Sequence, residues 1–564
     1  MVTATQLAPR ESTTAEVLND LFDMVGVPGK DFAFGGAYDG ARRYDESLAS
    51  WNPPLNSADL DLLPEKELLD ARSRETFRND AYVQGGANLH KDGIVGAMYF
   101  LNHKPNVEVL GLTEEQGEAL QQEVEALFTL WGESPRNWVD AARRNNFTGM
   151  IRLGVGVACT GGELLATIEW LRDKGREFNT AIQMVDTDRL DTPPERQWDA
   201  DIRRGIRMNQ YGAPQSYFIR VRHKNDTGTF IGENAWKFKE VDAEKPWGRQ
   251  QVIYLAEQLR VDQTRAVADI VAGLKEIAIT RKFRDVTLQN AVTGAMYAAS
   301  IESELPAEAV YQQLGGSTAG AITDYATQYL AAVNAYAGSA KHMKLDGVRI
   351  PHLFPGTKLQ IRPAGSPGGV GQDFEVSLLR YIAAALGVSY EELSRDYTKT
   401  NYSSARAAMA TTWKYMQARK RFFADAFANA IFRAWLEEAV NKNLLKNFPA
   451  SKAGELYTDG VLNLKFEALC NCDWIGAARG QIDELKETQA AVLRIKYGLS
   501  THEDELARLG KDWRKVYAQL QREAKEREER DIVLYEDNGT NAASGTTREA
   551  DDGGKDDGEK KDAA

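Results

Sequence analysis

The sequence predicts an α+β fold in which a region of mixed helices and strands is followed by a mainly helical second half. Short apolar runs separated by turn residues occupy residues 150–221, a pattern typical of strands and hairpins. Residues 264–300 contain no proline and have apolar residues at helical spacing, and helical periodicity dominates again from residue 374 onward. With 564 residues, the chain has room for three or four domains or one elongated subunit of several parts.

The N-terminal part is predicted to be a flexible arm that leads into a first helix. Residues 1–30 are polar, lack periodicity and end near Gly29. Residues 31–51 are rich in glycine, arginine and aromatic residues, and Pro53-Pro54 then marks a turn. A helix is expected from about Pro64 to Gln84, with its charged residues facing solvent.

The mixed region is predicted to contain strands joined by tight turns. From Met150 to Asp188 we expect a strand, a turn at Thr160–Gly162, and then a second strand or short helix. The stretch from Ile206 to Val221, built around Tyr211–Pro214, is predicted to be a hairpin.

Residues 264–300 are predicted to form one long helix, because they lack proline and their first glycine comes early, at position 273. The following segment, Pro306 to Gly371, is irregular and contains a short predicted strand at Leu359–Ile361, so we expect a compact inserted domain there. The apolar residues at helical spacing in the long helix are Val267, Ile270, Val271, Leu274 and Ile277.

The second half is predicted to be helical, beginning with a helix from Phe374 to Leu386 that stops at Gly387. Another helix is expected from Ser404, with Ser403 and Ser404 offering an N-cap, and it extends toward Leu445. Arg419–Arg421 interrupts the apolar stripe of this helix and should be exposed or at a kink. The predicted buried face comprises Met409, Trp413, Met416, Phe423, Phe427, Ile431 and Trp435, which we interpret as core.

A helical pair is predicted near the C-terminus, over Gln481–Tyr497 and His502–Arg530, with Thr501 as the N-cap of the second helix. Residues 541–564 contain seven acidic and four basic side chains and no aromatic residue, so the tail is predicted to be disordered.

The composition narrows the class of protein. Hydrophobic residues make up 43% and charged residues 27%, as in ordinary globular proteins. Three cysteines, Cys159, Cys470 and Cys472, are too few for a disulfide framework and favour a reducing compartment. The longest apolar runs, such as Tyr381–Val388, are too short to cross a membrane. A net charge of −13 argues against a protein that grips DNA through many phosphates.

The motifs of nucleotide and metal enzymes are missing from the sequence. No phosphate-binding P-loop occurs, and Gly154-Val-Gly156 is interpreted as part of an apolar strand. Gly315–Ala319 lacks the last glycine of a nucleophile elbow. The six histidines form no metal-binding pair, and Cys470 and Cys472 are predicted to be partly buried free thiols.

We therefore predict a protein without enzymatic activity, cofactor or metal. Asp186-Thr187-Asp188 is interpreted as a capped turn rather than as an acid–base pair. Two alternatives stay open at this point: an enzyme with an unfamiliar site, and a scaffold or adaptor that forms no ring.

Several segments in consistent order resemble the lambda-type portal protein family of tailed bacteriophages. The most specific are Ile382–Asp396 and Asn401–Arg406. Two departures, Val261–Ala266 in place of a Pro/Gly turn and Ile475-Gly476 in place of an Asp-Pro, leave the local geometry open. The other similar segments are Tyr38–Arg43, Trp51–Pro54, Leu69–Arg74, Arg78–Tyr82, Gln183–Leu190, Ile202–Ile206, Trp474–Gly476, Lys486-Glu487 and Tyr497–Thr501.

The resemblance implies a dodecameric ring at one capsid vertex that forms a channel for double-stranded DNA. It implies docking of the terminase large subunit, of major capsid and scaffolding proteins, and of head–tail connector proteins. It also implies assembly in the host cytoplasm, residence in the virion and no hydrolysis of nucleotide. The implied order is an N-terminal arm at 1–35, a mixed α/β wing at 36–262, the first stem helix at 263–300, the clip at 301–372, the second stem helix and tunnel loop at 373–403, the long helix with the helical wing and crown region at 404–537, and the disordered acidic tail at 538–564.

The resemblance places the tunnel loop at Ser394–Asn401, where Arg395, Tyr397 and Lys399 are candidates for weak contact with DNA. Asp396 would limit the attraction. The alternative is that Arg395 and Asp396 pair locally and Asn401 caps the next helix. Twelve subunits of net charge −13 would carry −156, so the ring as a whole would repel phosphate and reduce sticking, although the charge also serves solubility.

Overall fold

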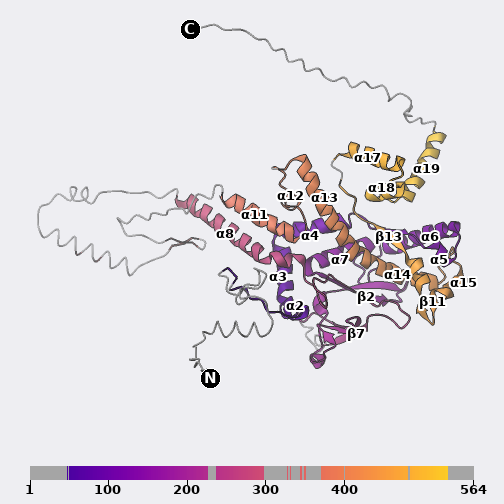
Figure 1. The fold of residues 1–564 in the computed structure, drawn as a ribbon, viewed down its shortest axis with the longest axis horizontal. Coiled ribbons are helices and arrows are strands. Elements are labelled where there is room, and N and C mark those ends of the chain that lie inside the picture. The colour runs from indigo at the N-terminus through magenta and orange to yellow at the C-terminus, as the bar shows by residue number, and fades with distance from the viewer. Residues whose placement is uncertain are drawn as a thin grey trace, which may run out of the picture.

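A mixed body of helices and sheets carries a pair of projecting helices (Figure 1). The computed structural model describes residues 47–225, 237–297, 370–480 and 483–530 apart from 49 and 399, and within 298–369 only 327, 331, 343–345 and 348–350. Both helices and antiparallel sheets are present, which confirms the predicted mixture.

Two helices, not one, form the first helical region after the short α2 (Ala58–Leu62). Helix α3 (Lys66–Asn79) ends at Asp80, and α4 (Ala81–Ile94) begins there. The single helix predicted over 64–84 is therefore wrong in its continuity. Asp80 is extended, with ψ 117°, and its carboxylate accepts hydrogen bonds from the N–H groups of Tyr82 and Val83, so it ends one helix and caps the next.

The strand predicted at the start of the mixed region is wrong, because residues Phe147–Gly161 form the buried helix α7. A Cβ at Gly154 would lie 2.6 Å from the Leu164 side chain, and one at Gly156 would lie 2.4 Å from the Lys91 side chain. The glycines therefore allow close packing of a helix, which apolar periodicity alone cannot distinguish from a buried strand. Gly162, with φ +74°, ends α7.

Two antiparallel sheets follow α7. The first has the order β3-β2-β8, from β2 (Glu163–Trp170), β3 (Thr180–Val185) and β8 (Val252–Ala256). The second has the order β4-β5-β6-β7, and its β5–β6 pair confirms the hairpin predicted around Tyr211–Pro214. Its strands are β4 (Ile202–Arg203), β5 (Ile206–Met208), β6 (Pro214–Arg220) and β7 (Phe238–Asp242). Short 3-10 turns, η3 (Thr187–Arg189) and η4 (Pro194–Arg196), join the two sheets.

The long helix of the second half confirms the predicted irregularity at Arg419–Arg421. Helix α13 (Tyr402–Arg419) passes through a π-helical turn, η7 (Lys420–Asp425), into α14 (Ala426–Asn441). Lys420 Nζ lies 2.8 Å from Asp425 Oδ1 and donates to the Trp474 carbonyl, which fixes this turn. The predicted N-cap is wrong, because Asn401, rather than Ser403 or Ser404, caps α13.

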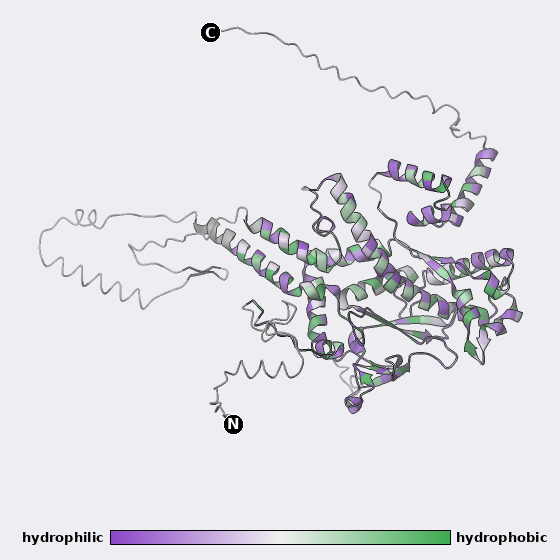
Figure 2. Cartoon of the chain, viewed as in Figure 1, coloured by the Kyte–Doolittle hydropathy of each residue, from purple (hydrophilic) through white to green (hydrophobic). Residues whose placement is uncertain are grey.

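An aromatic cluster around α14 forms the centre of the main core. Phe128 packs edge-to-face on Phe147, Phe432 and Trp435, with ring centroids 5.0–5.5 Å apart. The predicted buried face is confirmed at Met416, Phe423, Phe427, Ile431 and Trp435, whereas Met409 and Trp413 are only half-buried. Hydrophobic residues gather in the body, whereas α19 at its edge is largely hydrophilic (Figure 2).

Short elements surround this core. Strand β1 (Phe100–His103) pairs with β13 (Cys472–Ile475), so segments about 370 residues apart lie side by side. The other elements near the core are α5 (Val107–Leu110), α6 (Glu114–Gly132), α15 (Ala450–Ala453), η8 (Gly454–Leu456), β11 (Tyr457–Thr458), β12 (Val461–Leu462) and α16 (Leu464–Cys470).

The C-terminal region contains three helices where two were predicted. These are α17 (Glu484–Lys496), α18 (His502–Arg508) and α19 (Trp513–Glu529). The predicted second helix breaks at Gly510, whose φ is +70°, and restarts with Asp512 as the N-cap. Thr501 caps α18 by accepting from the Asp504 N–H, as predicted.

Some predictions fall outside the described residues. These are the N-terminal arm, the strand at Leu359–Ile361 and the acidic tail. Within the segment predicted as an inserted domain, only the antiparallel strands β9 (Met343–Leu345) and β10 (Val348–Ile350) are described beyond single residues. Among the described helices, none is long and apolar enough to span a membrane.

Candidate functional site

Two antiparallel helices project from the body and flank the segment 298–369 (Figure 1). They are α8 (Leu274–Tyr297), entered through the 3-10 turn η6 (Asp269–Gly273), and α11 (Val370–Ala385). The Phe283 ring packs edge-to-face on the Phe374 ring, with the ring centroids 5.3 Å apart. Beside them, Arg284 Nε donates a hydrogen bond to Glu375 Oε1 at 2.7 Å. A Cβ added to Gly273 would lie 3.3 Å from the Ala385 side chain. The start of the first helix therefore meets the end of the second, as expected for an antiparallel pair in contact along its length.

The long helix predicted from Thr264 starts later than expected, because residues 264–268 are used to anchor it. The Arg265 side chain, 4% exposed, enters the core and donates to both carboxylate oxygens of Glu163, at 2.9 and 2.8 Å. Residues 264–268 lie outside the helices because Arg265 and Ala266 must reach Glu163.

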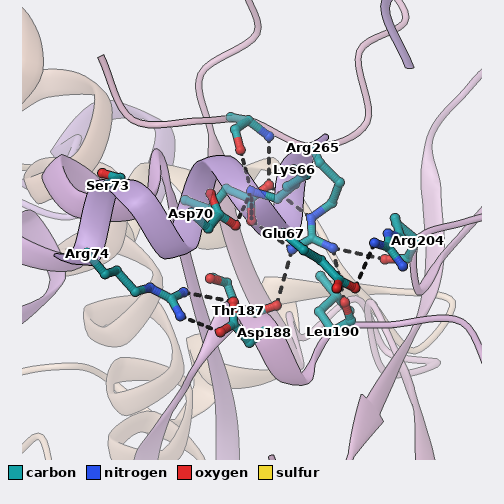
Figure 3. A network of polar contacts seen from close by, with 12 residues as sticks. Lys66, Glu67, Asp70, Ser73, Arg74, Thr187, Asp188, Leu190, Arg204 and Arg265 are labelled. Atoms are coloured by element: carbon teal, nitrogen blue, oxygen red, sulfur yellow. Dashed lines mark hydrogen bonds and ion pairs between the residues drawn. The ribbon is translucent and has the colours of Figure 1, made fainter. Parts of the chain in front are cut away.

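Glu163 is the centre of a buried ion network (Figure 3). Its side chain is 0% exposed, and its carboxylate accepts hydrogen bonds from the Arg265 guanidinium, the Ala266 N–H and the Tyr254 hydroxyl. Lys66 Nζ lies 3.4 Å from the same carboxylate. Burial alone would raise the pKa of Glu163, but the Arg265 and Lys66 charges and these hydrogen bonds more than compensate, so the pKa lies below its ordinary value.

The same arginine ties the segment that leads into α8 to both sheets. Arg265 also donates to the backbone carbonyls of Thr187, Leu190 and Arg204, at 3.0–3.2 Å. Arg74 of α3 pairs with Asp188 alongside (Figure 3). Asp186 caps η3, which confirms the prediction that this acidic triplet caps a turn. No local pattern in the sequence indicates this network, since Glu163 and Arg265 are 102 positions apart.

The C-terminal end of α11 is held by a second polar junction. Gly387, with φ +65°, ends the predicted helix and lies against the Tyr415 ring, where a Cβ would come within 2.4 Å. His90 Nε2 lies 2.8 Å from the Leu386 carbonyl, and burial lowers the pKa of His90. Tyr415 and Arg419 of α13 both contact Asp269 at the start of η6, so both projecting helices are fixed to α13.

The loop predicted to contact DNA connects α12 (Tyr390–Ser394) to α13, and its two ends are well defined. At the first end, Ser389 and Glu392 form a capping box, and Glu392 also accepts from the Thr412 hydroxyl at 2.6 Å. At the second end, Asn401 and Ser404 form another capping box, so Asn401 caps α13, as the alternative reading proposed.

Between these ends, the candidate residues Arg395 and Tyr397 are exposed. Arg395 follows α12 in the left-handed conformation, with φ +56°. Tyr397 is 50% exposed, and partial burial, together with Glu392 and Glu391, raises its pKa. Asp396 accepts from the Thr398 hydroxyl at 2.6 Å. Lys399, the third candidate, lies outside the described residues.

Replacing Asn401 with alanine should loosen the start of α13 by about 0.5–2 kcal/mol, because the Ser404 N–H loses its acceptor. Hydrogen exchange of residues 402–405 should become faster. Asn401→Asp keeps a capping oxygen and serves as the control. Equal exchange in the alanine variant and the wild type would show that the cap contributes nothing.

The described residues offer little for metal or thiol chemistry. Within them, no group of three or more His, Cys, Asp or Glu side chains is placed to hold a metal ion. Cys159, Cys470 and Cys472 form no disulfide; the predicted partial burial is confirmed for Cys472, whereas Cys470 is buried. Burial raises the pKa of Cys159 and of Cys472 to about 12 and that of Cys470 above its ordinary value, so these thiols are poor nucleophiles near neutral pH.

Comparison with known proteins shows which family this arrangement represents. The family described as "Phage portal protein, lambda family" matches residues 44–420, from before α2 to the end of α13. The chain belongs to the lambda family of phage portal proteins. It is 35% identical to portal protein B of Escherichia phage lambda over 494 residues, covering 88% of this chain and 90% of that protein. It is 36% identical to the portal protein of Escherichia phage N15, and that match covers 89% of this chain and 93% of that protein.

A more distant likeness is found among solved structures. The chain matches one from the neck of an empty GTA particle computed with C6 symmetry, at 13% identity and a TM-score of 0.37. That match covers 82% of this chain and 96% of the other. Membership of the portal family therefore rests on the sequence relatives.

Proposed function

We propose that this portal-family chain is the subunit of a dodecameric ring at one capsid vertex, whose channel passes double-stranded DNA during packaging and ejection. The observation that carries the proposal is the antiparallel pair α8 and α11, which flanks an inserted segment and is anchored to the body at both inner ends. In this assignment α8 and the part of α11 from residue 373 onward form the stem, residues 301–372 the clip, residues 36–262 the wing, and residues 404–537 the helical wing and crown region.

Exposed apolar residues on the stem support packing between neighbouring subunits. On α8, Ile279 and Val286 are 42% and 45% exposed and lie seven positions apart. On α11, Tyr381 is 50% exposed, and Phe374, seven positions earlier, keeps 44% exposure beside its contact with Phe283, so each pair falls on one side of its helix. A head-to-tail ring needs two different complementary surfaces on each subunit, and an aliphatic and an aromatic stripe can provide them.

Within the ring, the net charge favours passage of DNA over retention of DNA. Twelve copies at −13 would carry −156, which repels phosphate at a distance. The exposed loop between α12 and α13 would supply weak local contact through Arg395, Tyr397 and Lys399. Because the capping boxes fix both ends of the loop, Arg395 and Tyr397 would be presented at a defined place on each subunit.

The proposal includes the partners and location that such a ring requires. The terminase large subunit would dock on it for packaging, the major capsid and scaffolding proteins would surround it, and head–tail connector proteins would follow. It would assemble in the host cytoplasm and stay in the virion. Its role would be structural and would involve no enzymatic activity, cofactor or metal.

The mass of the purified full-length chain tests this function most directly. Twelve copies of the 62.7-kDa chain give about 752 kDa, and native mass spectrometry should detect this closed species. Negative-stain images should show a ring with a central hole. A compact monomer under every assembly condition would refute the proposal, and an adaptor role would then be favoured.

Replacing Lys399 with alanine should slow packaging of DNA without affecting ring mass, because one weak phosphate contact per subunit is lost. Packaged DNA per particle, measured over time at low and high salt, is the readout, and the defect should shrink at high salt. Lys525→Ala, at an exposed position of α19, is the matched control. Packaging equal to wild type in every condition would rule out the contact.

A further inference from the structure

A surface turn is held rigidly against the first described helix. Arg260 Nη1 lies 2.9 Å from Asp61 of α2, and its other Nη donates to the Asn56 carbonyl at 3.0 Å. Asp59 of α2 accepts from both the N–H and the hydroxyl of Thr264, at 2.8 and 2.6 Å. The side chain of Gln263, 5% exposed, accepts from the N–H groups of Leu259 and Arg260 and closes the turn.

These contacts present a group of aliphatic side chains to the outside. The entry patch, defined as Leu55, Leu60, Leu259 and Val261, has exposed fractions of 101%, 60%, 75% and 85%. Each member is next in sequence to a residue that makes one of the contacts joining α2 to the turn. All four exposed aliphatic side chains therefore flank the contacts that hold the turn against α2. Exposed apolar side chains gathered at one firmly held place mark an interaction surface.

The residues that precede the described chain have the composition to cover this patch. Residue 47 is the first that is described, eight positions before Leu55. Residues 31–46 contain four aromatic side chains, Phe32, Phe34, Tyr38 and Tyr44, whereas residues 1–30 contain only Phe22. Sixteen residues can span up to roughly 50 Å, so the segment can fold back onto the patch. We propose that the aromatic segment 31–46 docks on the entry patch of its own chain and shields it from solvent.

Docking within one chain is favoured over docking between chains by the short connection. A tether of a few residues gives the segment a high effective concentration at the patch of its own subunit. The shield would keep four aliphatic side chains from driving non-specific association before the ring closes. The proposal does not depend on the ring, because a monomeric chain would also have its patch covered.

Photo-cross-linking from the patch tests the proposal. Leu259→Cys in the full-length chain is labelled with benzophenone maleimide, because the three native thiols have pKa values raised by burial and react poorly at neutral pH. After irradiation, trypsin should release the label attached to peptide 31–42, which is bounded by Lys30 and Arg42. Chains carrying the label are mixed before assembly with 15N-labelled wild-type chains, so that capture within one chain gives an unlabelled peptide.

Capture of the unlabelled 31–42 peptide supports the proposal. Capture of the 15N peptide would show docking on a neighbouring subunit and overturn it, as would capture of another segment or of nothing. Leu464→Cys, at a position 81% exposed on α16, is the matched control and should not capture residues 31–42. A Phe32→Ser, Phe34→Ser variant should lose most of the product and bind more hydrophobic dye, and unchanged capture would contradict docking through the aromatic residues.

Discussion

Replacing Glu163 with glutamine should destabilise the junction between the start of α8 and the body by about 3–5 kcal/mol. The substitution leaves Arg265, which is 4% exposed, as a buried charge without its counter-charge. Native-state hydrogen exchange at β2 and at residues 264–268 should report the loss, because these segments carry the two partners. An Arg265→Met, Glu163→Gln double variant should recover part of the stability, since it removes both charges.

The control for this prediction is an ion pair at the surface. Asp473 pairs with Lys104 at 3.0 Å, and the two side chains are 56% and 41% exposed, so Asp473→Asn should change stability by less than about 1 kcal/mol. If Glu163→Gln is equally mild, the network does not anchor the start of α8.

The buried pair of Glu163 and Arg265 also predicts how the stability of the fold depends on pH. The pKa of Glu163 in the folded chain lies below its ordinary value of 4.5. The ionised carboxylate therefore makes its full contribution to folding stability at pH values above 4.5. The contribution is then lost as the pH falls through the lower, folded-state pKa.

Replacing both Ile279 and Val286 with aspartate should abolish the proposed ring and leave folded monomers. Burying an aliphatic side chain of this size contributes about 1.5–3 kcal/mol, and the variant removes two from every subunit interface and adds charges that have no partner. Native mass spectrometry should therefore show loss of the closed species. Circular dichroism should stay close to that of the wild type, because both positions are over 40% exposed in the single chain.

Leu464→Asp is the matched control for ring closure. Leu464 is 81% exposed and begins α16, where an acidic side chain suits the positive end of the helix dipole. This variant should assemble normally. Intact rings from the Ile279→Asp, Val286→Asp variant would show that this face of α8 lies outside the subunit interface and would remove the main support for the proposed stem packing.

Features with a strong local signal were determined by the sequence alone. Gly387 ends α11, Thr501 caps α18, and Tyr211–Pro214 turns a hairpin, because each acts through backbone conformation or a hydrogen bond within a few residues. The interruption at Arg419–Arg421 was also visible, since charges break the apolar stripe there. The order of short motifs along the chain was sufficient to indicate the portal family, which the curated relatives confirm.

Only the tertiary structure decided which distant groups meet. Residues 147–161 form a helix rather than a strand because Gly154 and Gly156 let it pack closely against Leu164 and Lys91, neighbours that local periodicity does not specify. Likewise, Arg265 leaves the predicted helix because Glu163, 102 positions away, requires a counter-charge in the core. A buried charge is stable only with its partner, so the start of helix α8 depends on a contact that no local pattern contains.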